Sequence, residues 1–192
     1  QMVQGVDANS KLGCSVRVLV DGAWGFAATE NLSEAAIRKI TESAIALAKG
    51  QAGWRAQPTE IETLPAYEGT WELPIEVDPF TVSLEEKVER LLGINRSAQD
   101  TGASFCYSYL LAVRERKWLA NSFGSRLTQS RVRLHPSFSV TLTDPKQGGF
   151  ASRESFLPPR AAGYEHFRDW DAVSEAALAV EQAKEKMAAP SV

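Results

Sequence analysis

RVRLHPSFSVTLT, from Arg131 to Thr143, is the stretch of sequence that decides the fold. Apolar and polar residues alternate through it without a break, which is the pattern of a β-strand with one face in a core and one in water. The predicted buried face consists of Val132, Leu134, Phe138, Val140 and Leu142. The predicted wet face carries Arg131, Arg133 and His135, followed by Ser137, Ser139 and Thr141.

Other strands flank this one. Apolar residues alternate over 105–113, and a charged segment at 114–117, interpreted as a turn, leads into a further apolar run at 118–122. After the long strand, a turn rich in Gly at 144–149 returns the chain into 150–156. The sequence therefore predicts an antiparallel meander of about four strands.

A row of aromatic residues, Phe105, Tyr107 and Tyr109, recurs at every second position of the first of these strands. The row has two interpretations: a peptide-binding surface, or part of the core. Because aromatic residues at this spacing are more often buried, we predict that the row belongs to the core. Cys106 lies inside it, which favours a buried thiol over a nucleophile.

Helices are predicted on both sides of residues 51–79, a region without regular alternation of apolar and polar residues. An apolar run at 14–20, an Asp-Gly pair and an aromatic-rich run at 24–29 predict a β-hairpin, and a helix ending near Lys49-Gly50 follows. The string SLEE at Ser83 indicates a capping box that opens a second helix. A last helix begins at about Asp171.

The predicted class is α+β, with a hairpin and helix first, then a helix, the meander and a final helix. Residues 51–79 are rich in Pro and acidic groups and predict an ordered connection rather than a regular element. We therefore expect three parts: residues 1–55 belong to an amino-terminal α/β domain, 56–77 connect, and 78–189 form a middle α+β domain.

Composition limits the partners and the compartment. The net charge of -3 and a pI near 5.5 provide no positive field for phosphate backbones, so nucleic acid is not an expected partner. No apolar run reaches the length of about 18 residues that spans a membrane, and no membrane contact is expected. Two unpaired cysteines, Cys14 and Cys106, favour a reducing cytoplasm.

Four strings, in this order, carry a resemblance to a known family. They are VRVLVDGAWGFAAT at 16–29, DPF followed by SLEEKVERLL at 78–92, NSFGS at 121–125, and AGYEHF at 162–167 followed by a helix. Together they resemble the amino-terminal and middle regions of the TldD/PmbA family, zinc-dependent peptidases also called modulators of DNA gyrase. The resemblance implies that the family's first helix and strand pair would precede Gln1.

The resemblance also implies a catalytic metal site that this chain does not contain. In the family, an HExxxH zinc motif follows a helix similar to 171–189, and the sequence ends without such a motif. His135 and His166, the only histidines, fall on different predicted elements. Zinc hydrolysis needs about three protein ligands and a base. We therefore expect no cofactor in this chain, and zinc in an absent carboxy-terminal domain.

Two functions follow as expectations. In the first, the chain is a non-catalytic fragment of a metallopeptidase that acts on peptides or unfolded proteins, with Arg131, Arg133 and His135 guiding the peptide substrate; a solvated strand face is the simpler explanation of these residues. In the second, the chain is a peptide-binding or dimerisation module without catalysis. The resemblance implies a homo- or heterodimer with a family member. Whether the parent protein is of the metal-bearing or metal-free type stays open.

Overall fold

The structure is a computed structural model of the 192-residue chain, and it describes residues 2–54, 57–144 and 148–189. The chain folds into two compact units. Residues 5–64 form the first, here called the hairpin unit, and residues 65–189 form the second, the sheet unit, with which 2–4 also group. Each is described by itself.

In the hairpin unit, β1 (Cys14–Val20) pairs antiparallel with β2 (Ala23–Thr29) and α1 (Glu34–Ala52) packs on them. The turn residues Asp21 and Gly22 both have positive φ, 48° and 73°, as a two-residue hairpin turn demands. This confirms the predicted hairpin and helix. The helix continues past the predicted end at Lys49-Gly50.

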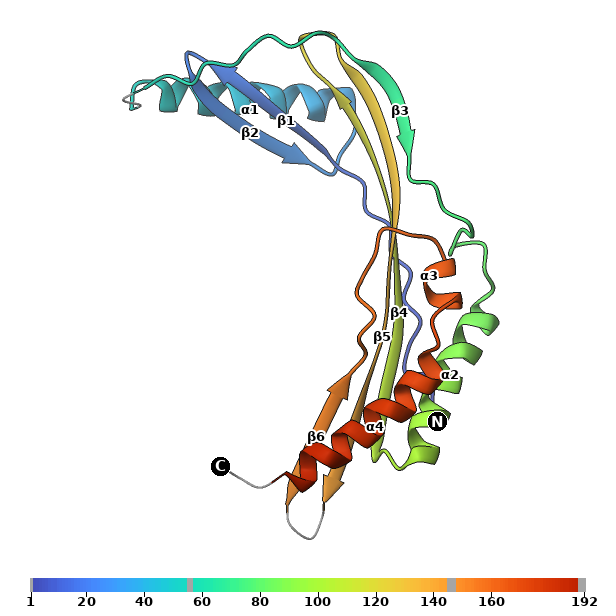
Figure 1. The fold of residues 1–192 in the computed structure, drawn as a ribbon. Coiled ribbons are helices and arrows are strands. Elements are labelled where there is room, and N and C mark those ends of the chain that lie inside the picture. Colours follow the sequence, from blue (N-terminus) through green and yellow to red (C-terminus); the bar gives the residue numbers. More distant parts are fainter. Residues whose placement is uncertain (1, 55–56, 145–147, 190–192) are drawn as a thin grey trace. The chain divides into compact units, whose positions relative to one another are not determined.

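The sheet unit is built on four strands (Figure 1), and β5 is the central strand to which the other three pair. β4 and β6 run antiparallel to β5, whereas β3 runs parallel to it. The bounds are β3 (Glu68–Glu72), β4 (Phe105–Ala120), β5 (Arg126–Asp144) and β6 (Gly149–Glu154).

One face of this sheet is covered by helices: α2 (Leu84–Thr101) contacts β4, α4 (Ala172–Ala188) contacts β5 and β6, and the short α3 (Glu165–Arg168) contacts β5. The five residues predicted to face inward on the long strand are all 9% exposed or less, and they join Ile94, Tyr164, Phe167 and Val180 in one core. The α+β class is confirmed.

Two details of the meander were wrong. The charged segment 114–117 is not a turn, because β4 continues through it to Ala120. The sheet is also not wholly antiparallel, because its fourth member is β3, within the segment expected to have no regular element. β3 is exposed on every residue, so no alternation of apolar and polar side chains marks it in the sequence.

Pro136 lies in the middle of the central strand, an unusual place for a residue without an N–H. Its neighbour Leu134 exchanges both backbone hydrogen bonds with Arg160, and Phe138 accepts one from Ser155. Between these two points no strand pairs with β5 on that side, since β6 ends at Glu154. Pro136 therefore lies where β5 has no paired strand on the side to which its N–H would point.

Candidate functional site

The face of β4, β5 and β6 opposite the helices is here called the open face. It carries the odd-numbered residues of β4 and β5, because the even-numbered ones face the core. The aromatic row lies on the open face: Phe105 is 66% exposed and Tyr107 54%. The prediction that the row is buried was wrong. The helices cover the other side of the strand, where Cys106, Leu110 and Ala112 point.

His135 and Tyr109 pack against each other on the open face. The Tyr109 hydroxyl lies 3.3 Å from both Nδ1 and Nε2 of His135, and the two rings meet edge to face at 5.2 Å. Tyr107 extends the row, with its ring centre 6.0 Å from that of Tyr109. The pair gives this surface aromatic rings set nearly at right angles, with polar atoms where the two rings meet.

Arg133 lies beside His135 on the same face, Arg131 lies two residues further along that face, and Glu115 engages both arginines across the strand pair. Arg131 contacts the carboxylate at 2.7 Å, Lys117 at 3.2 Å and Arg133 at 3.3 Å. Hydrogen bonds from Lys117 and Arg131 hold the pKa of Glu115 below its ordinary value, against the effect of burial. Three cations around one carboxylate leave a local excess of positive charge.

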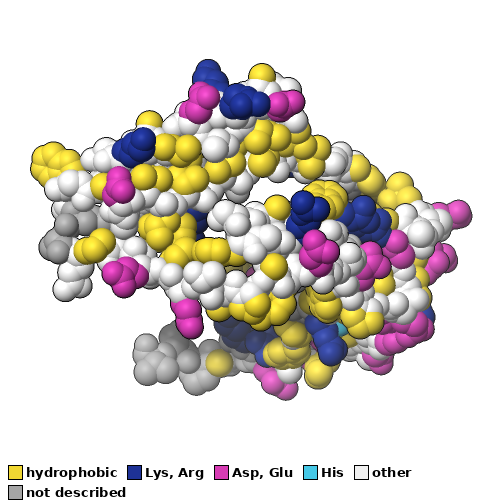
Figure 2. Space-filling view, turned by 90° about the horizontal axis from the view of Figure 1, so that it is seen from above, with side chains coloured by type: hydrophobic (Ala, Val, Ile, Leu, Met, Phe, Trp, Pro, Cys, Tyr) yellow, Lys and Arg dark blue, Asp and Glu magenta, His cyan; other side chains and the backbone are white. Residues whose placement is uncertain are grey.

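Charges of both signs are also interspersed elsewhere. On the side of the molecule that Figure 2 shows, Lys and Arg side chains lie next to Asp and Glu, with hydrophobic side chains exposed between them. The face shown in Figure 2 therefore carries no broad basic surface.

A groove of about 390 Å³ lies on the open face between the aromatic row and the segment that follows β6. His135 lines it together with Tyr107 and Tyr109, whereas Arg131 and Arg133 do not. Of the three residues predicted to guide a substrate, the structure places one in the groove and two outside it, on the same face. The remaining lining residues are Ser137, Phe138, Ser139, Glu154 and 155–159.

Residues 155–159 line the groove opposite the aromatic row and are here called its far wall. This segment is held by backbone hydrogen bonds at both ends. Ser155 donates to the Phe138 carbonyl at 3.0 Å, and Arg160 exchanges two bonds of 2.9 Å with Leu134. Between these two ends, Nε2 of His166 lies within hydrogen-bond distance, 2.9 Å, of the Pro158 carbonyl oxygen. Two successive prolines between these points restrict the backbone further. Sequence reasoning missed this wall, and the Pro-Pro pair was the only local signal for it.

Among the described residues, no three His, Cys, Asp or Glu side chains lie close enough to hold a metal ion. His135 is on β5, whereas His166 is in α3 and bonded to a carbonyl. Cys106 bonds to Asn95 at 3.2 Å, and burial raises the pKa of its thiol to about 11, so the thiol stays protonated at neutral pH. The residues present therefore do not fit a catalytic zinc.

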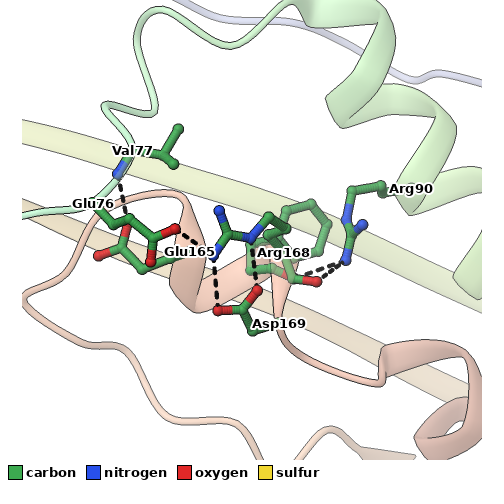
Figure 3. Close-up of polar contacts among 7 residues, drawn as sticks. Glu76, Val77, Arg90, Glu165, Arg168 and Asp169 are labelled. Atoms are coloured by element: carbon green, nitrogen blue, oxygen red, sulfur yellow. Dashed lines mark hydrogen bonds and ion pairs between the residues drawn. The ribbon is translucent and has the colours of Figure 1, made fainter.

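Glu165 and the start of α3 are bonded to the segment around Val77, which lies far away in the sequence (Figure 3). The Glu165 carboxylate accepts from the backbone N–H of Val77 at 3.0 Å and of Gly163 at 2.8 Å. Tyr164 donates its own N–H to the Val77 carbonyl at 2.7 Å. A Cβ at Gly163 would lie 2.4 Å from that same carbonyl oxygen, so the approach requires glycine. We call these four residues the α3 anchor.

Charged groups on either side support the α3 anchor. Arg168 bonds to Glu76 at 2.8 Å and to Asp169 at 2.7 Å. Arg90 on α2 donates to the carbonyls of Phe167 and Arg168. In Figure 3, Glu76 and Arg90 approach α3 from opposite sides. Two of the strings singled out in the sequence, SLEEKVERLL and AGYEHF, thus meet in the fold through Arg90 and Phe167.

Comparison with known proteins agrees with this geometry. The family model for the PmbA/TldA metallopeptidase domain 1 matches residues 2–48, and the model for the PmbA/TldA metallopeptidase central domain matches residues 77–187. The chain belongs to the PmbA/TldD metallopeptidase family, in its first and central domains.

A solved structure shows the same fold. The crystal structure of a proposed modulator of a DNA gyrase from Thermotoga maritima is similar to this chain with a TM-score of 0.63 and 16% identity. The similarity covers 94% of this chain and 39% of the Thermotoga chain. The present chain thus spans well under half the length of that protein. No curated protein gives a significant match.

No helix among the described residues is long and apolar enough to cross a membrane. Cys14 and Cys106 are both free thiols.

Proposed function

We propose that this chain is the scaffold and substrate-guiding part of a metallopeptidase of the PmbA/TldD family, acting on peptides or unfolded proteins in the cytoplasm. Zinc and the catalytic base would come from a further domain, because the residues described here do not fit a metal. Family membership supports the reaction class. The groove on the open face supports the guiding role.

The observation that carries the proposal is the chemistry of the groove. Tyr107 and Tyr109 offer flat, partly exposed rings, His135 offers a hydrogen-bonding ring nitrogen, and the prolines of the far wall are apolar. Aromatic surface with few polar groups accepts many side chains, and the excess of positive charge at Arg131 and Arg133 attracts a peptide's carboxylates. Broad recognition of this kind suits a peptidase of low sequence specificity.

The test is the double variant Arg133→Ser/His135→Ser in the full-length protein. Both side chains lie on the open face, so the core residues Val132, Leu134 and Phe138 keep their packing and the protein should fold. We expect KM for a peptide substrate to rise several-fold while kcat changes little, because the lost contacts bind substrate without stabilising the transition state. Steady-state kinetics on a fluorogenic peptide measure both.

Arg116→Ser is the matched control. It removes an exposed cation from the same strand pair, but from an even-numbered position on the side opposite the open face. The control should leave KM unchanged. If the double variant folds and its KM equals that of the native protein, the guiding role is refuted and the open face is simply solvated.

The second candidate is a module that binds peptide or dimerises without catalysis. The observation that favours it is the outer edge of β4, with which no strand of the described chain pairs.

A further inference from the structure

The shape of the groove follows from the sizes of the side chains on three neighbouring strands. Its floor carries two small serines of β5, Ser137 and Ser139, with Tyr107 and Tyr109 of β4 on one side and Glu154 of β6 on the other. Tyr107, Ser139 and Glu154 lie in one cross-strand row, because Ser139 is the register partner of both others. Since neighbouring strands are about 4.8 Å apart, the backbones of Tyr107 and Glu154 are about 10 Å apart, with only a serine between them.

Glu154 gives the groove its charge. It is the only Asp, Glu, Lys or Arg among the described residues that line the groove. Its exposed carboxylate has no hydrogen bond or ion pair with any part of the chain that the structure describes. The preceding residue, Arg153, is engaged on the opposite side of the sheet, where its Nε donates to Gln182 of α4 at 2.8 Å. The groove therefore has a free negative charge on one side and an aromatic ring on the other.

A carboxylate and a tyrosine ring on either side of a space of this width suit a cation. The carboxylate of Glu154 accepts hydrogen bonds from an ammonium or guanidinium group, and the π-electrons of Tyr107, which is 54% exposed, attract the same charge. The methylene groups of a long basic side chain can pack on the apolar far wall. We propose that this row binds the side chain of a lysine or arginine in the substrate peptide. This role rests on the proposed function, because it requires a peptide in the groove.

The positive charge around Glu115 does not oppose this role. Arg133, the nearer of the two arginines, does not line the groove and lies six residues from Ser139 on β5. Six residues of extended chain span about 20 Å, which exceeds the Debye length of about 8 Å at physiological ionic strength. A basic residue bound at Glu154 is therefore screened from Arg133, and the carboxylates of the same peptide can still be attracted to Arg133 at the other end.

The test is peptide binding to the full-length protein, measured by fluorescence anisotropy, which requires no turnover. The peptides are acetylated and amidated at their ends and differ at one central position, which holds lysine, norleucine or glutamate. We expect the lysine peptide to bind about fivefold more tightly than the norleucine peptide, as one exposed ion pair and one cation–π contact provide. Glu154→Gln should abolish this preference and leave the affinity for the norleucine peptide unchanged. Glu154→Lys should reverse it in favour of glutamate.

Three further variants separate the charge and the ring from general effects. Glu72→Gln removes an exposed carboxylate of the same sheet outside the groove, and it should keep the full preference for lysine. Tyr107→Phe retains the ring and should also keep the preference, whereas Tyr107→Leu should lower it. Circular dichroism should be native for all of them, because these side chains are exposed.

Equal affinity of the native protein for the lysine and norleucine peptides overturns the proposal, and so does a preference that survives Glu154→Gln. A neutral peptide with a free amino terminus is a further arm: if Glu154→Gln weakens its binding but not that of the lysine peptide, the bound cation is the terminus and the assignment to a side chain is wrong. Failure of the guiding role gives a different result. If Arg133→Ser/His135→Ser weakens all three peptides while lysine has no advantage, the groove binds peptide and only the role of Glu154 is refuted. If neither set of variants changes the binding of any peptide, both are refuted.

Discussion

Glu165 shows how a residue that suggests chemistry in a sequence can have a structural task. Next to His166 it resembles a fragment of a metal motif, but its carboxylate bonds to the backbone of Val77 and Gly163, while His166 bonds to a carbonyl. Burial disfavours the charge of Glu165, yet the backbone N–H groups outweigh this and lower its pKa. Ionised Glu165 is thus part of what holds the α3 anchor.

The lowered pKa predicts how stability depends on pH. A carboxyl whose pKa is lower in the folded state than in the unfolded state adds stability above the unfolded value, about 4.3, and loses it as pH falls through the folded value. We expect Glu165→Gln to be less stable than the native chain at pH 7, and this difference to shrink below about pH 4. Urea unfolding between pH 7 and pH 3 measures it.

Glu185→Gln, on the exposed side of α4, is the control and should follow the native curve. If the difference in the free energy of unfolding between Glu165→Gln and the native chain stays constant from pH 7 to pH 3, the α3 anchor does not require the charge of Glu165.

At the scale of elements, the sequence predicted best where burial alternates and worst where it does not. The long strand and its five inward residues follow from alternation alone. Residues 114–117 were mistaken for a turn because they are charged, but there Glu115 meets Arg131 and Lys117 on the strand surface, where charges are solvated and paired. The aromatic row has the right period, but a period cannot tell which face the helices cover.

Capping of α2 provides a prediction at this scale. The Ser83 hydroxyl accepts from the N–H of Glu86 at 3.1 Å, as the string SLEE predicted. Ser83→Ala should lower the free energy of unfolding by about 1 kcal/mol, because an N–H at the helix start loses its partner. Chemical denaturation gives the value, and Ser83→Asp should retain most of the stability. No measurable loss in the alanine variant would mean that water replaces the cap.

For the whole molecule, family and class could be recognised from four strings, but the arrangement of the site could not. The groove joins β4 and β5 to a wall that follows β6, and only the register of the sheet brings Tyr109, His135 and Pro158 together. No spacing in the sequence encodes that register. The charged neighbours Arg131 and Arg133 were visible as a stripe, whereas their engagement by Glu115 depends on cross-strand pairing.

Metal binding is the prediction that belongs to the whole chain. We expect the purified 192-residue chain to hold no stoichiometric zinc and to cleave no peptide, because its described residues provide no set of ligands. Metal analysis after dialysis measures the first and a fluorogenic peptide the second. The full-length protein is the positive control. One tightly held zinc per chain would refute the assignment of catalysis to another domain.

The connection between β4 and β5 has a consequence for the order of folding. These two strands are joined by only the segment 121–125, and β4 pairs with β5 along all of its length, so their contacts begin close to the turn and can form stepwise, at low entropic cost. The bond from Val77 to Glu165 instead closes a loop of 88 residues. We therefore expect the β4–β5 hairpin to form early, and Glu165 to bond to Val77 only when most of the sheet unit is already native.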